Sequence, residues 1–266
     1  MEHLLKNGEI TLHKSDSGNG GLTKEVHLLK HKEKKYILRI CPNKKTAENY
    51  LNLYHKLKKY KFFPELLDSK GKYLLFEYLE GRDLEIEDAS KYAFEIGKIV
   101  ALITKIKISK NQLFNLDKKF FRKLTFITNK KILSKKLKEE LTKRYKEYKR
   151  LSKIKVKIDL NDLSPSNFRL TKGKVYFVDI EAIKPEPRLY CIGKGFLKWF
   201  KKLRQRKKFL AGFNSIKGSK FLNKDELKFI YLYFLINNIY HKYERKDKSY
   251  TKQLKQINRL LENKLK

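Results

Sequence analysis

The sequence is poor in cysteine and in metal-ligand motifs. Its 266 residues include 2 Cys, which lie far apart as Cys41 and Cys191, so neither a disulfide framework nor a zinc site with paired cysteine ligands is expected. The 6 His show no metal-ligand spacing, and repeats and low-complexity linkers are absent. The 16 Tyr, 17 Phe and 41% hydrophobic residues instead predict a folded chain with a substantial apolar core.

Long hydrophobic runs are also missing. The longest run, over residues 229–236, falls well short of the ~18 residues that suggest a membrane span. The first residues have neither the basic start nor the apolar stretch of a signal peptide. We therefore expect a cytoplasmic protein without a transmembrane segment.

Acidic residues are scarce relative to basic ones. The 29 Asp and Glu stand against 65 Lys and Arg, which leaves a formal charge of +36. Such a charge attracts polyanions, including nucleic acid, anionic lipid and acidic glycans. However, 11 of the basic residues are Arg and the rest are Lys spread along the whole chain, as a general preference for lysine would also produce. We expect no specific nucleic-acid site, while an anionic surface or glycolipid stays open as a partner.

Two regions of different periodicity follow one another. Short alternating segments predict strands over 8–13, 25–30, 36–41, 62–67 and 72–79, and one helical segment covers 44–60. From residue 80 on, apolar residues recur at helical spacing, with Asn223 and Glu226 as a capping box, and a short hairpin over 168–178 interrupts the helices.

These patterns predict an α+β protein of two lobes. The N-terminal lobe, residues 1–79, would hold a five-stranded antiparallel sheet with one helix, and the larger, mainly helical lobe would cover residues 80–266. Ligand sites form readily where two lobes meet.

One loop and one strand end carry the polar groups that could do chemistry. Asp162 precedes Asn167 by five residues, and Asp179 follows at the end of an apolar strand, with Glu181 two residues beyond. Phosphoryl transfer needs such a set, because one carboxylate accepts the proton of a substrate hydroxyl while an amide oxygen and a second carboxylate hold Mg²⁺. The order and flanking structure favour this site over a simple turn, in which Asp and Asn are also common.

The same residues resemble a known family. Residues 160–167, Leu-Asn-Asp-Leu-Ser-Pro-Ser-Asn, are similar to the His-(Gly/Asn)-Asp-Leu-x-Pro-x-Asn catalytic loop of the aminoglycoside phosphotransferases and choline kinases, which have the protein-kinase-like fold. Residues 178–181, Val-Asp-Ile-Glu, resemble the segment that carries the metal-binding Asp of that family. The resemblance implies Asp162 as catalytic base, and Asn167 and Asp179 as Mg²⁺ ligands. Leu160 stands in place of the usual His.

The N-terminal region extends the resemblance. Residues 36–39, Tyr-Ile-Leu-Arg, resemble the third strand of the family, which implies that Arg39 contacts nucleotide phosphates and that Glu48 pairs with it. Glycines between the first two strands would cover the phosphates, and residues 76–79 would form the hinge that meets adenine. The implied nucleotide-binding residues are Arg39, Glu48, Gly18, Gly20, Gly21, Glu77 and Leu79.

The function implied is that of an ATP-dependent, Mg²⁺-requiring phosphotransferase acting on a hydroxyl of choline or another amino alcohol, a sugar or an aminoglycoside. An anionic glycolipid or a protein is a further acceptor within this class. The alternative, which Leu160 and the high charge suggest, is a catalytically weak kinase-like module that binds nucleotide or an anionic macromolecule. An RNA-binding accessory is a third hypothesis. Turnover with ATP that is lost on replacing Asp162 would distinguish the enzyme from both.

Overall fold

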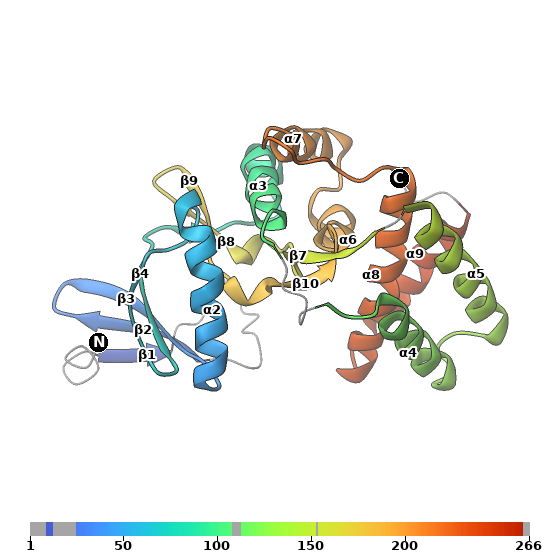
Figure 1. Ribbon diagram of the computed structural model, residues 1–266, viewed down its shortest axis with the longest axis horizontal. Coiled ribbons are helices and arrows are strands. Elements are labelled where there is room, and N and C mark those ends of the chain that lie inside the picture. Colours follow the sequence, from blue (N-terminus) through green and yellow to red (C-terminus); the bar gives the residue numbers. More distant parts are fainter. Residues whose placement is uncertain (1–8, 13–24, 108–112, 153, 263–266) are drawn as a thin grey trace.

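The computed structural model describes residues 9–12, 25–107, 113–152 and 154–262 of the chain. The glycines expected over the phosphates, Gly18, Gly20 and Gly21, lie outside the described residues. In Figure 1 a sheet and one helix lie at one end of an elongated molecule, and most helices of the second half lie at the other. The short strands next to Asp162 and Asp179 lie between these two ends.

Five antiparallel strands form the predicted N-terminal sheet, in the order β1-β2-β3-β5-β4. They are β1 (Glu9–Leu12), β2 (Glu25–His31), β3 (Lys34–Ile40), β4 (Leu66–Lys70) and β5 (Tyr73–Glu77). The buried leucines Leu29, Leu38 and Leu75 form a small core of their own on this sheet.

The fourth strand begins later than the sequence predicts. A strand was expected over residues 62–67, but β4 starts at Leu66. The carbonyl oxygen of Phe62 accepts a hydrogen bond from Phe177 N–H (2.8 Å), and the ring of Phe62 lies 5.0 Å from that of Phe63. Tertiary packing therefore holds this apolar segment outside the sheet.

The predicted helix after the third strand is confirmed as α2 (Lys44–Leu57). The side-chain oxygen of its N-cap residue, Asn43, accepts a hydrogen bond from Thr46 N–H (2.9 Å). This bond satisfies one of the donors that a helix start leaves unpaired. The helix buries Ala47, Tyr54 and Leu57.

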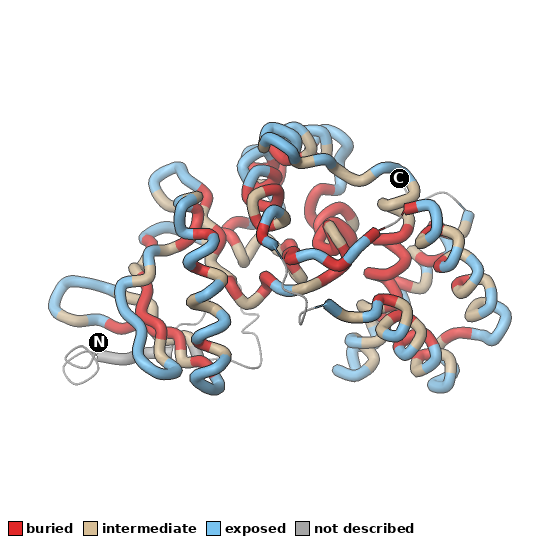
Figure 2. Tube along the Cα trace, viewed as in Figure 1, coloured by how far each residue is buried: buried red, intermediate tan, exposed pale blue. Residues whose placement is uncertain are grey.

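The second half is mainly helical, as predicted. Its longer helices are α3 (Ala89–Thr104), α4 (Leu116–Asn129), α5 (Lys135–Ser152), α7 (Leu203–Asn214), α8 (Lys224–Glu244) and α9 (Thr251–Leu261). The predicted capping box opens α8, where Asn223 and Glu226 exchange hydrogen bonds of 2.8 and 2.9 Å. Residues 229–236 of α8 are all buried among the other helices, which explains their continuous apolar run (Figure 2). Within the described ranges, no helix is long and apolar enough to cross a membrane.

Short strands carry the polar loop. The strand β7 (Val156–Leu160) pairs with β10 (Ile183–Pro187), and β8 (Phe168–Thr171) pairs with β9 (Lys174–Phe177) as the predicted hairpin. A two-residue strand, β6 (Arg82–Asp83), lies beside β8. Two 3-10 turns, η3 (Pro165–Asn167) and η4 (Ile180–Ala182), follow β7 and β9 along the chain.

One hydrophobic core extends from α2 to α9. The rings of Phe63 and Phe177 meet edge to face with centroids 5.5 Å apart. Phe168 lies 5.2 Å from Phe177 and 5.7 Å from Trp199. Because such aromatic contacts add to the stabilisation from burial, the β8–β9 hairpin is anchored on both sides.

Candidate active site

Asp162 lies in a loop that hydrogen bonds from Ser164 and Asn167 hold in shape. The strand β7 ends at Leu160, which is fully buried, and the chain turns through η3 before β8 begins. The Asn167 side-chain amide donates to the carbonyl oxygen of Asp162 (3.0 Å), and the Ser164 hydroxyl donates to the Asp162 carboxylate (2.5 Å). The five-residue spacing thus brings Asp162 and Asn167 together.

Asn167 and Asp179 lie at the same end of the β8–β9 hairpin. Phe168 pairs with Phe177 in register, and next to this pair Val178 N–H donates to the carbonyl oxygen of Asn167 (3.0 Å). Asp179 is the next residue and caps η4, because its Oδ1 accepts a hydrogen bond from the second residue of that turn (3.2 Å). The hairpin register therefore brings the backbones of the two expected metal ligands close together.

The donors at this hairpin end fit Mg²⁺. The amide oxygen of Asn167 has no partner among the described residues, and Asp179 supplies a carboxylate. Mg²⁺ prefers such oxygen ligands and is usually held by one or two carboxylates together with substrate phosphates and water. In the part of the chain that the structure describes, no group of three or more His, Cys, Asp or Glu could hold a metal ion alone. Nucleotide phosphates and water would have to complete the coordination.

Lys194 forms an ion pair with Asp162 that the sequence did not predict. Its ammonium lies 2.5 Å from Oδ1 and 2.6 Å from Oδ2 of Asp162. Lys194 lies on the short helix α6 (Cys191–Lys194), 32 residues along the chain, so no local pattern reveals the contact. A substrate hydroxyl that approaches Asp162 must compete with this ammonium.

Arg39 pairs with Glu181. The sequence led us to expect Glu48 as its partner, and that expectation is wrong. Nη1 of Arg39 lies 2.5 Å from Oε1 of Glu181, and these side chains are 11% and 16% exposed. The side chain of Glu48 is 55% exposed and lies 3.9 Å from Lys44. The reason is that α2 buries Ala47 and leaves Glu48 on its solvent side. Arg39 is thereby joined to the segment that follows Asp179.

A double-mutant cycle would measure the Arg39–Glu181 pair. We expect Arg39→Met and Glu181→Gln to couple by about 1.5–3 kcal/mol in the free energy of unfolding, because either change alone removes the same charged hydrogen bond. Urea denaturation of the wild type, both single variants and the double variant gives this coupling. The pair Arg39→Met with Glu48→Gln is the control and should be additive. Coupling of equal size in the control would contradict the observed pairing.

A buried arginine holds the expected hinge. Glu77 ends β5, and its backbone N–H and its carboxylate both contact the backbone of Glu65. The carbonyl oxygen of Leu79 accepts a hydrogen bond from Arg169 Nε (2.7 Å), whereas Leu79 N–H has no partner among the residues described. Arg169 also donates to the carbonyl oxygen of Gly81 (2.7 Å). The hinge therefore keeps one backbone donor that an acceptor nitrogen of a nucleotide base could use.

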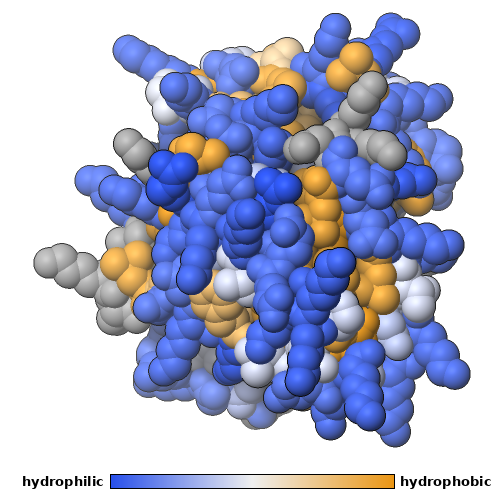
Figure 3. Space-filling model, turned by 90° about the vertical axis from the view of Figure 1, so that its right-hand side faces the viewer, coloured by the Kyte–Doolittle hydropathy of each residue, from blue (hydrophilic) through white to orange (hydrophobic). Residues whose placement is uncertain are grey.

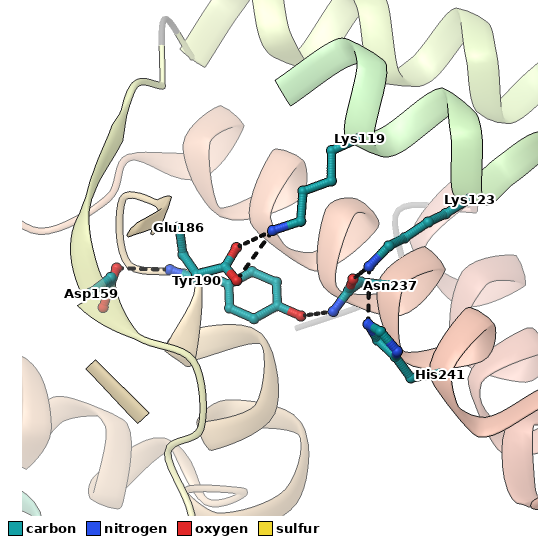
Figure 4. Close-up of polar contacts among 7 residues, drawn as sticks. All are labelled: Lys119, Lys123, Asp159, Glu186, Tyr190, Asn237 and His241. Carbon is teal, nitrogen blue, oxygen red and sulfur yellow. Dashed lines mark hydrogen bonds and ion pairs between the residues drawn. The ribbon is translucent and has the colours of Figure 1, made fainter. Parts of the chain in front are cut away.

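A buried polar network lies beside α6 (Figure 4). Asp159 on β7 is fully buried and accepts a hydrogen bond from Tyr190 N–H (3.0 Å), and burial raises the pKa of Asp159 to about 7. The Tyr190 hydroxyl accepts from the amide of Asn237, whose oxygen accepts from the ammonium of Lys123. Lys123 is 4% exposed, and desolvation lowers its pKa to about 8. These bonds fix the start of α6 against β7, α4 and α8.

His241 makes this network sensitive to acid. Its Nε2 lies 3.0 Å from the Lys123 ammonium, and its Nδ1 lies 3.2 Å from Oε2 of Glu244. Desolvation, reinforced by Lys123, lowers the pKa of His241 below its ordinary value of 6.5. The unfolded chain then takes up a proton at a higher pH than the folded chain. We expect the free energy of unfolding to fall as pH drops below 6.5 and through the folded pKa of His241.

Urea denaturation between about pH 7 and pH 5 would show this loss. The matched variant is His241→Gln, because its amide oxygen can still accept from Lys123 but does not titrate. Asp159 acts in the opposite direction, since its raised pKa makes the folded state bind the extra proton, and it is present in both proteins. The difference between the two curves therefore isolates His241. Parallel curves would contradict its role.

Comparison with known proteins identifies the fold. No protein-family model matches the chain, and no curated protein matches it in sequence. Among solved structures, an ethanolamine kinase from Plasmodium vivax is 15% identical with a TM-score of 0.69, and the match covers 99% of this chain and 86% of that one. A choline kinase from Streptococcus pneumoniae is 16% identical with a TM-score of 0.68, covering 97% of this chain and 95% of that one.

An ADP-bound aminoglycoside phosphotransferase is similar to the same extent. It is 17% identical with a TM-score of 0.65, and the match covers 98% of this chain and 95% of that one. At these identities the similarity establishes the fold. The chain has the predicted two-lobed, protein-kinase-like fold, with a small antiparallel sheet region and a larger helical region.

Proposed function

We propose that this chain, whose fold is that of choline kinases and aminoglycoside phosphotransferases, transfers the γ-phosphoryl group of ATP to a hydroxyl group and requires Mg²⁺. The observation that carries the proposal is that Asp162, Asn167 and Asp179 are joined through one loop and one hairpin end. Solved structures of this fold contain AMP, ADP and GDP, which supports a nucleotide site between residues 1–79 and residues 80–266.

Each polar residue has a place in this reaction. Asp162 would accept the proton of the acceptor hydroxyl. The oxygen of that hydroxyl would bond to the γ-phosphorus while the bond between the γ-phosphorus and the leaving ADP oxygen breaks. Asn167 and Asp179 would hold Mg²⁺, which neutralises charge on the phosphoryl group when bound. Arg39, held by Glu181, would lie along the nucleotide phosphates.

The hinge and the sheet supply the remaining predicted contacts. The N–H of Leu79 is a donor suited to an adenine nitrogen. Glu77 at the end of β5 and Glu48 on α2 stay predictions as nucleotide contacts, as do the three glycines outside the described residues. The acceptor in this proposal is a small molecule such as an amino alcohol, a sugar or an aminoglycoside, or an anionic glycolipid.

Calorimetric titration with a non-hydrolysable ATP analogue tests the nucleotide site. We expect binding that is strengthened by Mg²⁺, and we expect Asp179→Asn to weaken Mg²⁺-supported binding at least ~10-fold, because a ligand of the ion loses its charge. Binding without Mg²⁺ should change little in the variant. The control is Glu139→Gln on α5, which removes a carboxylate elsewhere. A wild-type protein that binds no nucleotide would refute the proposal.

The ion pair between Lys194 and Asp162 favours a second candidate, a kinase-like module that binds nucleotide without turnover. An ammonium that stayed on Asp162 would prevent it from accepting a proton. A screen of amino alcohols, sugars, aminoglycosides and their phosphorylated forms with MgATP decides between the two. Phosphate transfer to any of them supports the kinase, and nucleotide binding without transfer supports the module.

A further inference from the structure

Three carboxylates whose charges affect the pKa of Tyr190 or of Lys198 are already paired with lysines. Asp162 itself pairs with Lys194 at 2.5 Å. Glu186 on β10 lies 3.2 Å from the ammonium of a lysine on α4 (Figure 4). Its negative charge, like that of Asp162, raises the pKa of Tyr190. Asp247, after α8, lies 3.4 Å from the ammonium of a lysine on that helix. Thus each of these three carboxylates has a lysine as its partner.

Lys198 is a cation in the same region without such a partner. It lies on the π-helical turn η5 (Gly195–Trp199), which continues α6, four residues after Lys194. Among the residues that the structure describes, no carboxylate lies within ion-pair distance of its ammonium. Its pKa is lowered by desolvation and by the charges of Lys194 and Lys242, while Asp162 and Asp247 oppose the shift. The positive charges here outnumber the negative ones.

This arrangement disfavours a cationic acceptor. An amino alcohol or an aminoglycoside would need carboxylates for its ammonium groups, and it would have to displace a lysine from each one. An anionic acceptor meets the opposite situation. Its charged group can pair with Lys198 at no cost to an existing ion pair, and it can attract Lys194 as well.

We propose that the hydroxyl acceptor carries a phosphate or carboxylate group that Lys194 and Lys198 bind, a proposal that rests on the kinase function proposed above. When Lys194 turns from Asp162 to the acceptor anion, the Asp162 carboxylate becomes available to the acceptor hydroxyl. The same ammonium would therefore select an anionic substrate and release the base only when that substrate is present. An acceptor without negative charge would leave Lys194 on Asp162.

Matched probes with one carbon skeleton test the charge preference. Glycerol, sn-glycerol 3-phosphate and 3-amino-1,2-propanediol are neutral, anionic and cationic, and their binding would be measured by calorimetry with the Mg²⁺-loaded ATP analogue present. We expect glycerol 3-phosphate to bind at least ~10-fold more tightly than the other two, as charge-assisted hydrogen bonds require. Vesicles of phosphatidylglycerol, compared with vesicles of phosphatidylcholine, distinguish a lipid headgroup from a soluble phosphate. Binding to phosphatidylglycerol vesicles without binding of glycerol 3-phosphate would assign the site to a lipid headgroup.

Controls are needed because the whole chain is basic. The face at the end of the molecule where α4, α5 and α9 lie is covered mostly by hydrophilic side chains, with apolar patches between them (Figure 3). Lys143 on α5 lines a hollow between α4 and α5 and is exposed. Lys143→Met therefore removes the same charge at a separate place. We expect Lys198→Met to weaken glycerol 3-phosphate binding at least ~10-fold with an unchanged affinity for the ATP analogue, and Lys143→Met to have no effect.

The outcomes separate this inference from the proposed function. Equal binding of the three probes, no binding of either anionic probe, or equal losses in Lys198→Met and Lys143→Met would overturn the inference while nucleotide binding stays intact. A protein that binds no nucleotide would instead overturn the proposed kinase. Thermal unfolding of each variant confirms that it is folded.

Discussion

Replacement of Asp162 by Asn is expected to lower the rate of phosphate transfer from ATP by about 10²–10⁴-fold, the usual contribution of a general base. The amide has nearly the shape of the carboxylate and can still accept the hydrogen bond from the Ser164 hydroxyl, but it cannot take up a proton. The carbonyl oxygen that Asn167 binds belongs to the backbone and is unchanged. Chemistry should therefore be lost while the loop keeps its shape. Transfer of radiolabelled phosphate at saturating nucleotide measures the effect.

Two controls assign the loss to Asp162 as a base. Calorimetry should give the same affinity for the ATP analogue in Asp162→Asn and wild type, because the proposed metal ligands are Asn167 and Asp179 and both are unchanged. Glu139→Gln on α5 should leave both quantities unchanged. If Asp162→Asn turned over at the wild-type rate, Asp162 would not be the base. If it lost nucleotide binding and turnover equally, its role would lie in forming the site.

The parts of the site that were predictable are those set by local sequence. Asp162 and Asn167 are five residues apart in a loop with a Pro-containing turn. The side-chain amide of Asn167 donates a hydrogen bond to the backbone carbonyl oxygen of Asp162. Asp179 was placed by the same logic, since a two-stranded hairpin with a tight turn has a register that brings its ends together. Neither step depends on how distant parts of the chain pack.

Contacts between distant segments could not be predicted in the same way. Arg39 and Glu181 are 142 residues apart, and the sequence does not say which carboxylate a strand arginine reaches. The expected partner, Glu48, was chosen for its position on the following helix, but α2 presents that residue to solvent. Lys194 was missed for the same reason, as one lysine among many in a basic chain.

The fold shows the same division. Apolar stripes predicted α3, α5 and α9 and a capping box predicted α8, but neither α4 nor α7 was predicted. In α7, close backbone contact with α3 accompanies the packing of Phe209 and Phe213. A Cβ atom at Gly212 would lie 1.9 Å from the carbonyl oxygen of Phe94 on α3, and one at Gly97 would lie 2.1 Å from that of Phe209. A glycine at such a contact leaves a gap in the hydrophobic period that predicts a helix. The β7–β10 pair, whose strands are separated by the β8–β9 hairpin, was likewise not predicted.

Replacement of Arg169 by Met is expected to lower the free energy of unfolding by about 3–5 kcal/mol, as when one partner of a buried charge pair is removed. Arg169 is 8% exposed and donates to the carbonyl oxygens of Leu79 and Gly81 and to the carboxylate of Asp83, at 2.7, 2.7 and 2.9 Å. Met has a similar length but removes all three of these hydrogen bonds. Urea denaturation at constant pH measures the loss.

Arg82 supplies the matched control, because its ion pair with Asp88 is on the surface, with 51% of the arginine side chain exposed. Water can replace the lost bonds in Arg82→Met. The urea concentration at the midpoint of unfolding should therefore fall much less in Arg82→Met than in Arg169→Met. Equal shifts would mean that the Arg169 bonds contribute no more than a surface pair. Arg169→Lys should recover only part of the loss, since one ammonium cannot reproduce the planar fork that spans both carbonyls and the carboxylate. Because the fork also holds Leu79, both Arg169 variants should bind the ATP analogue more weakly than Arg82→Met, which ties the stability of the hinge to its use in nucleotide binding.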